Sequence, residues 1–408
     1  MQYQDDLALS YTASSEASAH QFNMVLDKYL SSRADTMKYL DELLASDNDM
    51  VMAHCFRGGI LKMGGDPKFS APIHLCIEAL HGLKGAMNER EQMHFSALQS
   101  WVNNQYTEAT NTFEAILSNH PKDILALRIA HYLHFYAGNS QQMCDSIAKV
   151  ATSWQESDPY YGYLQGMHSF GQEESGNYAE AETTGRQAVD INRQDIWAAH
   201  AVTHVFQMQG RTSEGIAWIE GLLGDWKGSN NFLYHLYWHK ALFHIGANEL
   251  DQALSLYDNH LVSILSDDFY LDVCNAAALL WRLQMRGLAI GDRWQALKTY
   301  SEKRIQDDEL VFITLHYLMT PALLKDQSMI NAAMDHFESW SQEHTTQGKV
   351  CRIVGLPLAQ SIVEIGKGEF ASATTRLSNI QKDIYRIGGS HVQRQLFDDL
   401  LNHYQPLI

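Results

Sequence analysis

Residues 104–121, NQYTEATNTFEAILSNHP, contain the pattern that decides the fold of this chain. Asn104 opens a turn, the small Ala109 follows five residues later, and the large Phe113 comes four residues after that, before Pro121. Two antiparallel helices approach closely only where the residue at their crossing is small. A large residue four positions further on lies on the same helix face and can cover the neighbouring helix. The stretch therefore predicts the turn and the second helix of a helical-hairpin repeat.

The same frame recurs along the chain. A turn residue is followed by a small residue five positions later at Gly176 and Ala181, Gly210 and Gly215, Asn248 and Ala253, Gly291 and Ala296, and Gly368 and Ala373, with a weaker copy at Gly138 and Met143. The turns at 104, 138, 176, 210 and 248 are spaced by 34, 38, 34 and 38 residues. A tetratricopeptide (TPR) unit has a period of about 34 residues and buries its apolar face only against neighbouring units. The spacing therefore predicts a TPR-like repeat array.

The fold class predicted for the whole chain is all-α. Proline is scarce, at seven residues, and the long segments place apolar residues three and four positions apart, as amphipathic helices do. We expect a TPR-like α-solenoid, in which antiparallel helix pairs form a right-handed superhelix. Residues 1–48 are expected to form N-terminal capping helices, residues 49–386 one continuous superhelix of repeats, and residues 387–408 a C-terminal capping helix.

Composition excludes several classes of partner. The formal net charge is -18, from 48 acidic and 30 basic side chains, which argues against binding to nucleic acid or to anionic membranes. The five cysteines are scattered without a C-x-x-C pair, as expected in a reducing compartment. The N-terminus lacks a basic segment followed by an apolar run, so it does not read as a signal peptide. We therefore expect a cytoplasmic location.

Two stretches place pairs of histidines four residues apart. They are HAVTHVFQMQGR at 200–211 and HLYWHKALFHIG at 235–246. Residues four apart share one face of a helix, and this spacing can bring two imidazoles to one metal ion. A buried imidazole that hydrogen-bonds a neighbouring carbonyl would satisfy the same pattern without any ligand. His131 and His134 are three apart and map to packing positions, so they are expected to be structural.

Several segments have sequences more specific than the general repeat pattern. WAAHAVTHVFQMQGR, YWHKALFHIG, LYDNHL, RADTMKYLDELL and RIGGSHVQRQLF together resemble the tetratricopeptide repeat protein 38 family, from about residue 30 to about residue 400. The resemblance implies a cytosolic, all-helical TPR superhelix that can associate with itself as a homodimer. One departure is Gln207, where many relatives are expected to carry an acid. If that acid were catalytic in the relatives, its replacement by Gln207 would argue against an enzymatic function for this chain.

The resemblance also implies which side chains line the concave surface. In TPR units, four positions of each first helix face that surface. When each turn residue is set at position 15, these positions carry Arg128, Tyr132, Phe135, Tyr163, Phe170, Glu173, His200, His204, Gln207, His235, Trp238, Trp281 and Met285. Mostly apolar walls with a few polar groups are typical of a site that holds a specific ligand.

The sequence is compatible with two functions. In the first, a rigid repeat array presents a groove lined by histidines and aromatic residues to a peptide, a protein partner or a small molecule, without a cofactor. In the second, the chain is a metal-dependent or histidine-based enzyme. Zinc, iron or copper would then be bound by His200, His204, His235 and His239, with Glu173 as another candidate ligand or general base. The H-E-x-x-H arrangement is missing, as are nucleotide-binding and nucleophile-elbow motifs.

Closure of the groove separates these ligand classes. Burial of His200, His204 and His235 in a pocket favours a small molecule, whereas an open and long groove favours a peptide.

Overall fold

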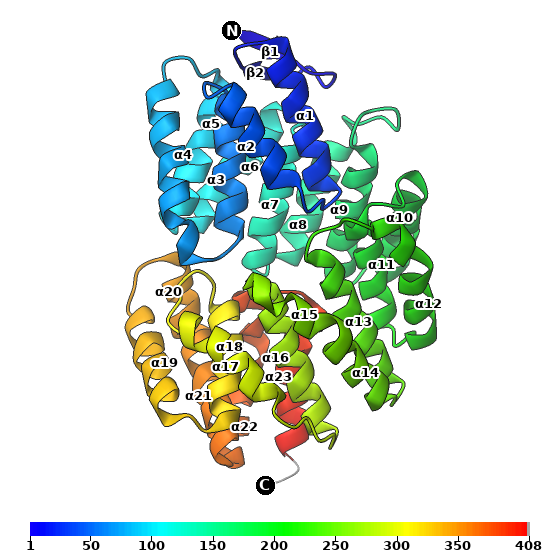
Figure 1. Ribbon diagram of the computed structural model, residues 1–408, viewed down its shortest axis with the longest axis vertical. Coiled ribbons are helices and arrows are strands. Elements are labelled where there is room, and N and C mark those ends of the chain that lie inside the picture. Colours follow the sequence, from blue (N-terminus) through cyan, green and yellow to red (C-terminus); the bar gives the residue numbers. More distant parts are fainter. Residues whose placement is uncertain (406–408) are drawn as a thin grey trace. The chain divides into compact units, whose positions relative to one another are not determined.

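The computed structural model describes residues 1–405, and helix follows helix along the chain from α1 to α23 (Figure 1). The chain forms two compact units. Unit 1 comprises Met1–His134, Asn139–Val205 and Trp218–Leu233, and unit 2 comprises Phe135–Gly138, Phe206–Ala217 and Tyr234–Ile408. Within each unit, helices that are adjacent in sequence pack against one another, for example α9 on α10 and α21 on α22. This all-helical architecture fits the predicted α-solenoid; the right-handed superhelix stays a prediction.

The elements that begin in unit 1 are two short strands followed by helices. They are β1 (Gln2–Gln4), β2 (Ser10–Thr12), α1 (Glu16–Leu30), α2 (Thr36–Ser46), α3 (Val51–Met63), η1 (Pro67–Phe69), α4 (Ser70–Leu83), α5 (Glu89–Val102), α6 (Tyr106–Asn119), α7 (Ile124–Tyr136), α8 (Ser140–Ala151), α9 (Tyr161–Glu174), α10 (Tyr178–Ile191), α11 (Ile196–Met208), η2 (Leu223–Trp226) and α13 (Phe232–Gly246). Helix α12 (Thr212–Leu222) begins in unit 2 and ends in unit 1.

The remaining elements belong to unit 2. They are α14 (Leu250–Leu256), the π-helical turn η3 (Tyr257–Leu261), α15 (Val262–Ile264), η4 (Leu265–Asp267), α16 (Tyr270–Met285), α17 (Arg293–Arg304), α18 (Val311–Leu324), α19 (Gln327–Trp340), α20 (Thr346–Val350), the π-helical turn η5 (Cys351–Gly355), α21 (Leu356–Lys367), α22 (Phe370–Ile380), η6 (Gln381–Ile387) and α23 (His391–Tyr404). Helix α23 falls where the C-terminal capping helix was expected. The last three residues of that segment, 406–408, lie outside the described residues.

The turns that set the repeat frame adopt left-handed backbone conformations. The φ angles are 57° at Asn104, 67° at Gly138, 83° at Gly176, 66° at Gly210 and 61° at Asn248. Glycine and asparagine tolerate this region better than other residues, which explains their recurrence between the paired helices. The turn positions predicted from the sequence are therefore confirmed.

The N-terminal segment departs from the prediction of capping helices throughout residues 1–48. Helices α1 and α2 occupy most of it, but β1 and β2 form an antiparallel hairpin that pairs Tyr3 with Tyr11. The carboxylate of Asp5 stabilises the turn, because its Oδ1 accepts hydrogen bonds from the backbone N–H groups of Leu7 and Leu9 at 2.9 and 2.8 Å. This Asp-centred turn is the local signal that helical periodicity could not show.

A buried ionic network ties the hairpin to α5. Arg90 donates to the backbone carbonyl of Ser10 at 2.8 Å and to Asp123 at 2.7 Å, and His94 lies 2.8 Å from the same Asp123 oxygen. Burial works to raise the pKa of Asp123, but His94 and Arg90 hold it well below its usual range. The negative charge therefore persists at neutral pH and anchors the start of α7.

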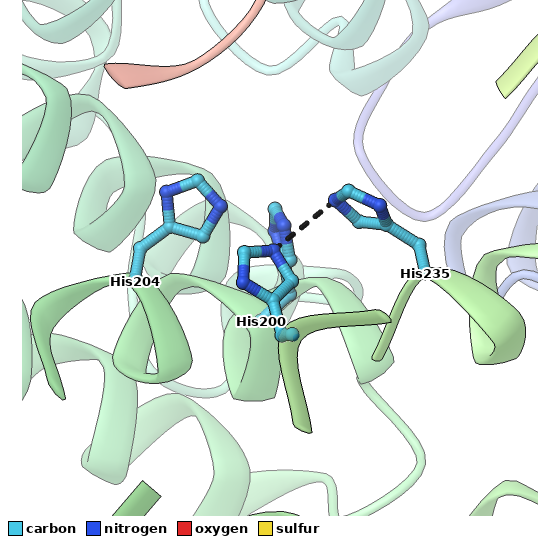
Figure 2. A group of neighbouring side chains, drawn as sticks. His200, His204 and His235 are labelled. Atoms are coloured by element: carbon cyan, nitrogen blue, oxygen red, sulfur yellow. Dashed lines mark hydrogen bonds between the residues drawn. The ribbon is translucent and has the colours of Figure 1, made fainter. Parts of the chain in front are cut away.

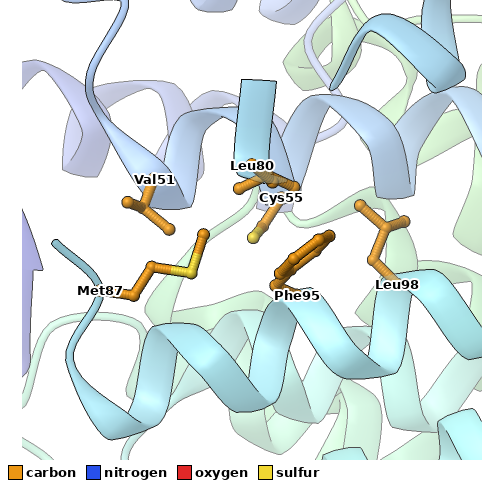
Figure 3. Packing of buried hydrophobic residues seen from close by; sticks show 6 residues of the cluster. All are labelled: Val51, Cys55, Leu80, Met87, Phe95 and Leu98. Atoms are coloured by element: carbon orange, nitrogen blue, oxygen red, sulfur yellow. The ribbon is translucent and has the colours of Figure 1, made fainter. Parts of the chain in front are cut away.

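The core beside this network is apolar. Figure 3 shows one cluster, in which residues of α3, α4 and α5 and the segment before α5 surround the thiol of Cys55. The cluster consists of Val51, Cys55, Leu80, Met87, Phe95 and Leu98. Burial raises the pKa of Cys55 far above its ordinary value, so this thiol is a packing residue.

The glycine at position 185 permits a close contact among three helices of unit 1. A Cβ placed on Gly185 would lie 2.5 Å from Ser169 Oγ of α9 and 2.5 Å from Val202 Cγ2 of α11. Real Cβ atoms do not approach other atoms so closely, so α10 reaches both helices only because position 185 lacks a side chain.

We expect Gly185→Ala to lower the free energy of unfolding by about 1–3 kcal/mol, because the added methyl group overpacks this crossing. The matched control is Gly221→Ala on α12, where an added Cβ meets no atom within 4 Å. That substitution is expected to leave stability unchanged or to raise it by up to about 1 kcal/mol through helix propensity. Urea denaturation of both variants measures the difference, and equal effects would contradict the packing argument.

Candidate functional site

His200 and His204 form the centre of the candidate site in unit 1. Both lie on α11 one turn apart, and Figure 2 shows their imidazoles on the same side of that helix. The ring centroids are 4.3 Å apart, and the residues are 3% and 0% exposed. The predicted sharing of one helix face is therefore confirmed for this pair.

Asp195 fixes the start of the helix that carries them. Its Oδ1 accepts hydrogen bonds from the backbone N–H groups of Trp197 and Ala198, both at 3.0 Å, as an N-terminal cap does. The carboxyl group is fully buried, and Oδ2 has no hydrogen-bond partner among the described residues. Burial raises the pKa of Asp195 to about 7, although the capping N–H groups and Arg128 oppose the shift.

An aromatic shell surrounds the two imidazoles. The indole of Trp197 lies 5.5 Å from His200 and 5.0 Å from Phe170 of α9, measured between ring centroids. Phe170 stacks on His200 at 5.4 Å, and Phe232 at the start of α13 contacts the same imidazole at 4.9 Å. The walls of the site are thus apolar, and its polar groups are placed at defined positions.

Two carboxylates at the end of α9 face His204. Its Nδ1 lies 3.3 Å from Glu173 Oε2 and 3.7 Å from Glu174 Oε1, and all three side chains are almost completely buried. A carboxylate placed this close to Nδ1 can orient the imidazole ring. Histidines that bind metal ions commonly have a carboxylate beside the ring nitrogen that does not bind the metal.

The second histidine pair belongs to unit 2 and has a related arrangement. His235 Nδ1 lies 3.2 Å from Asn275 Oδ1 of α16, and His235 Nε2 lies 3.2 Å from His239 Nε2. The dashed line in Figure 2 starts from the labelled His235 and marks the latter hydrogen bond. Because the amide oxygen can only accept, His235 carries its proton on Nδ1 and receives the proton of His239 on Nε2.

The other side chains predicted to line the groove lie in different surroundings. Tyr132 packs against Trp197 at 5.4 Å in unit 1, and Tyr163 accepts a hydrogen bond from Asn192 at 3.1 Å. Trp238, Trp281, Phe135 and Gln207 belong to unit 2.

Trp238 is fully buried and stacks on His235 at 5.1 Å. Trp281 is also fully buried, and its indole N–H donates to Tyr404 of α23 at 3.3 Å, which makes it part of the contact between α16 and the capping helix. Phe135 and Gln207 are half-buried.

Several residues of the site were not selected by the sequence analysis. They are Trp197, Phe232, Glu174 and Asp195 in unit 1 and, beside the second histidine pair, Asn275 in unit 2. Trp197 could have been found, because it precedes His200 by three residues and so shares its helix face. His131, expected to be structural, is buried and contacts Phe170 and Trp197, both at 5.8 Å.

Both sets of histidines have the donor atoms for a metal ion. His200, His204, His235 and His239 can each offer one ring nitrogen. Within unit 1, the ligand atoms of Glu173, Glu174 and His204 all lie within 4.8 Å of one another. Imidazole and carboxylate donors suit zinc, iron and copper, the metals considered from the sequence.

Comparison with protein-family models gives no match to this chain. The resemblance to the tetratricopeptide repeat protein 38 family therefore stays a prediction. None of the helices in residues 1–405 combines the length and apolar character that crossing a bilayer requires.

We expect Asp195 to make stability depend on pH. Its pKa rises from 3.8 in the unfolded chain to about 7 in the folded protein, so the folded state binds the proton more tightly. Stability contributed by that proton is present at low pH and is lost as pH rises from about 4 to about 7, at about 1 kcal/mol per pH unit. Asp195→Asn keeps the capping oxygen and removes the titration.

The measurement is urea denaturation of the parent and Asp195→Asn across this pH range. The variant should gain stability relative to the parent as pH rises. Asp190→Asn, at an exposed position of α10, is the control and should leave the difference flat. A flat difference for Asp195→Asn as well would refute the assignment.

Proposed function

We propose that this chain is a TPR-like binding protein whose ligand is a small molecule or ion held at His200 and His204. The observation that carries the proposal is the burial of a polar cluster inside aromatic walls: His204, Glu173 and Phe170 are each 0% exposed. An extended peptide needs a groove open to solvent along its length, so burial of this kind favours a small ligand over a peptide or protein partner.

Burying these polar groups costs folding free energy unless they are paired with one another or with a ligand. A buried ionised carboxylate must be paired, and each buried imidazole nitrogen left without a hydrogen bond costs about 1–3 kcal/mol. An apolar core of the same volume would satisfy the repeat packing at lower cost. We therefore interpret the carboxylate and imidazole groups as a recognition site with preorganised side chains, which lowers the entropy lost on binding.

A transition-metal ion is the second candidate, and the carboxylate beside His204 favours it. Metal-ligating histidines commonly have their other ring nitrogen hydrogen-bonded to a carboxylate or carbonyl oxygen, which orients the ring. Glu173 Oε2 lies 3.3 Å from His204 Nδ1, on the side from which such a carboxylate would orient the ring. In unit 2, Asn275 stands in the same relation to His235 at 3.2 Å. Packing between repeats does not require two imidazole pairs that each have an oxygen atom beside one ring nitrogen.

An enzymatic role would require either a bound transition-metal ion or catalysis by the imidazoles themselves. A bound ion would polarise a substrate or activate water, and a neutral imidazole with a free acceptor nitrogen can serve as a general base. If the protein contains metal, hydrolase and oxygenase reactions are the first to assay.

We expect protein purified without a His tag to contain zinc, iron or copper close to stoichiometrically under the metal proposal. His204→Ala should lose the ion, and Glu173→Gln should weaken its binding about 10- to 100-fold by releasing the imidazole. His239→Ala tests the second pair in the same way. Elemental mass spectrometry measures the metal content.

The matched control for this series is His134→Ala. His134 is also buried and lies 2.9 Å from a carboxylate, that of Glu114, but it has no place in the cluster around His204. It should retain the full metal content. Metal-free parent protein, or a metal content that survives both His204→Ala and His239→Ala, would rule out the metal proposal.

For a small organic ligand, we expect a compound that raises the melting temperature of the parent to fail with Phe170→Leu. Phe170 stacks on His200, so its truncation removes a wall of the site. Phe113→Leu on α6 is the control, because it truncates another fully buried ring and costs similar stability. Candidate compounds come from native mass spectrometry of the purified protein and from a metabolite screen by thermal shift. An equal response in both variants would place the ligand elsewhere.

A further inference from the structure

Arg128 on α7 is a buried guanidinium held between two aromatic rings of unit 1. It is 4% exposed, and its central carbon lies 4.1 Å from the ring of Trp197 and 4.9 Å from that of Tyr132. Such stacking on aromatic faces fixes the plane of the guanidinium and leaves its N–H groups to point outward along that plane.

This guanidinium lacks the acceptors that other buried arginines have. In residues 1–405, its one hydrogen bond is the donation to the Tyr132 hydroxyl at 3.2 Å, and no carboxylate oxygen lies within 4.0 Å. The other buried arginines each donate to a carboxylate or a backbone carbonyl: Arg90 to Asp123, Arg282 to Asp399, Arg304 to Asp307 and Arg394 to Gly389. Arg128 is therefore the exception among them.

Polar atoms without protein partners in residues 1–405 lie on and beside the same indole. They are Nε of Arg128, Nε1 of Trp197 itself and both ring nitrogens of His131, all on residues at most 4% exposed. Burial, aided by the charge of Arg128, lowers the pKa of His131 well below its ordinary value, so its imidazole is neutral at pH 7. Most buried polar atoms in proteins are hydrogen-bonded, so a cluster of exceptions around one ring indicates a ligand site.

We propose that Arg128 binds an oxyanion, a carboxylate or phosphate group, of the ligand that also contacts His200. This inference rests on the proposed function and names the chemical class of the ligand. Trp197 contacts both Arg128 and His200, so one small molecule lying along the indole reaches the two.

The chemistry of the guanidinium supports an anion rather than a neutral group. Its planar fork matches the paired oxygens of a carboxylate or phosphate, and such charge-assisted bonds are about twice as strong as neutral ones. The charge of Arg128 acts to lower the pKa of Asp195, but burial raises that pKa to about 7, so this acid is only partly charged at neutral pH. A ligand anion would supply the missing countercharge and relieve the cost of the buried cation.

The test is calorimetric titration of the full-length protein with inorganic phosphate and, separately, with succinate. The protein is first dialysed until native mass spectrometry detects no small ligand. We expect the parent to bind one of the two anions with a dissociation constant below about 10 mM, and Arg128→Gln to weaken that binding at least about tenfold. Arg128→Lys keeps the charge but not the fork and should fall between them.

Arg186→Gln is the matched control. Arg186 also lies over a tryptophan, 4.9 Å from the ring of Trp218, but it donates to Glu182 at 2.8 Å. Its replacement should leave anion binding unchanged. Circular dichroism and melting temperature establish that each variant is folded. If Arg128→Gln does not fold, the comparison of Arg128→Lys with the parent still tests the proposal.

The outcomes separate this inference from the proposed function. Phosphate binding alone assigns a phosphate group, and succinate binding alone assigns a carboxylate. Equal affinity in the parent and Arg128→Gln, or binding of neither anion by the folded parent, overturns the role of Arg128. If the metal content or the response to Phe170→Leu still reports a ligand at His204, only the assignment of Arg128 fails.

Discussion

The contact at Gly185 is a packing constraint on the helices that carry the candidate site in unit 1. A Cβ at this position of α10 would lie 2.5 Å from side-chain atoms of Ser169 on α9 and Val202 on α11, so the three helices meet at a residue that has no side chain. Glu173 follows Ser169 by one turn, and His204 follows Val202 by two residues. The same two helices, α9 and α11, place Glu173 Oε2 3.3 Å from His204 Nδ1.

The same packing explains why the polar groups can be buried at all. Two carboxylates and several imidazoles lie among aromatic rings, where a lone charge would be prohibitively costly. Close polar pairs reduce that cost: Glu173 Oε2 lies 3.3 Å from His204 Nδ1 in unit 1, and Asn275 is hydrogen-bonded to His235 in unit 2. Arg128 and His131 have buried nitrogen atoms without a hydrogen-bond partner among the described residues, and these atoms distinguish the candidate site from an ordinary repeat core.

The left-handed turns carried most of the information that the sequence held about the fold. Asn104, Gly176 and Gly210 are recognisable because few residues tolerate positive φ, and the small residues that follow them are recognisable because close helix crossings exclude large ones. The hairpin at β1 and β2 was missed for the complementary reason. Its stability comes from Asp5 and from contacts of Thr12 with Glu91 at 2.6 Å, which join residues far apart in sequence.

The sequence by itself determined the helical repeat, its turns and the placement of His200 with His204 on one helix face, because these depend on local spacing. Tertiary structure alone decided which groups support those imidazoles. Glu174 and Asp195 join the site in unit 1 from α9 and from the turn before α11, and Asn275 supports His235 in unit 2; no spacing in the sequence marks these three residues. Their roles follow from burial and from distances between helices, which determine whether a polar side chain is solvated, paired or held ready for a ligand.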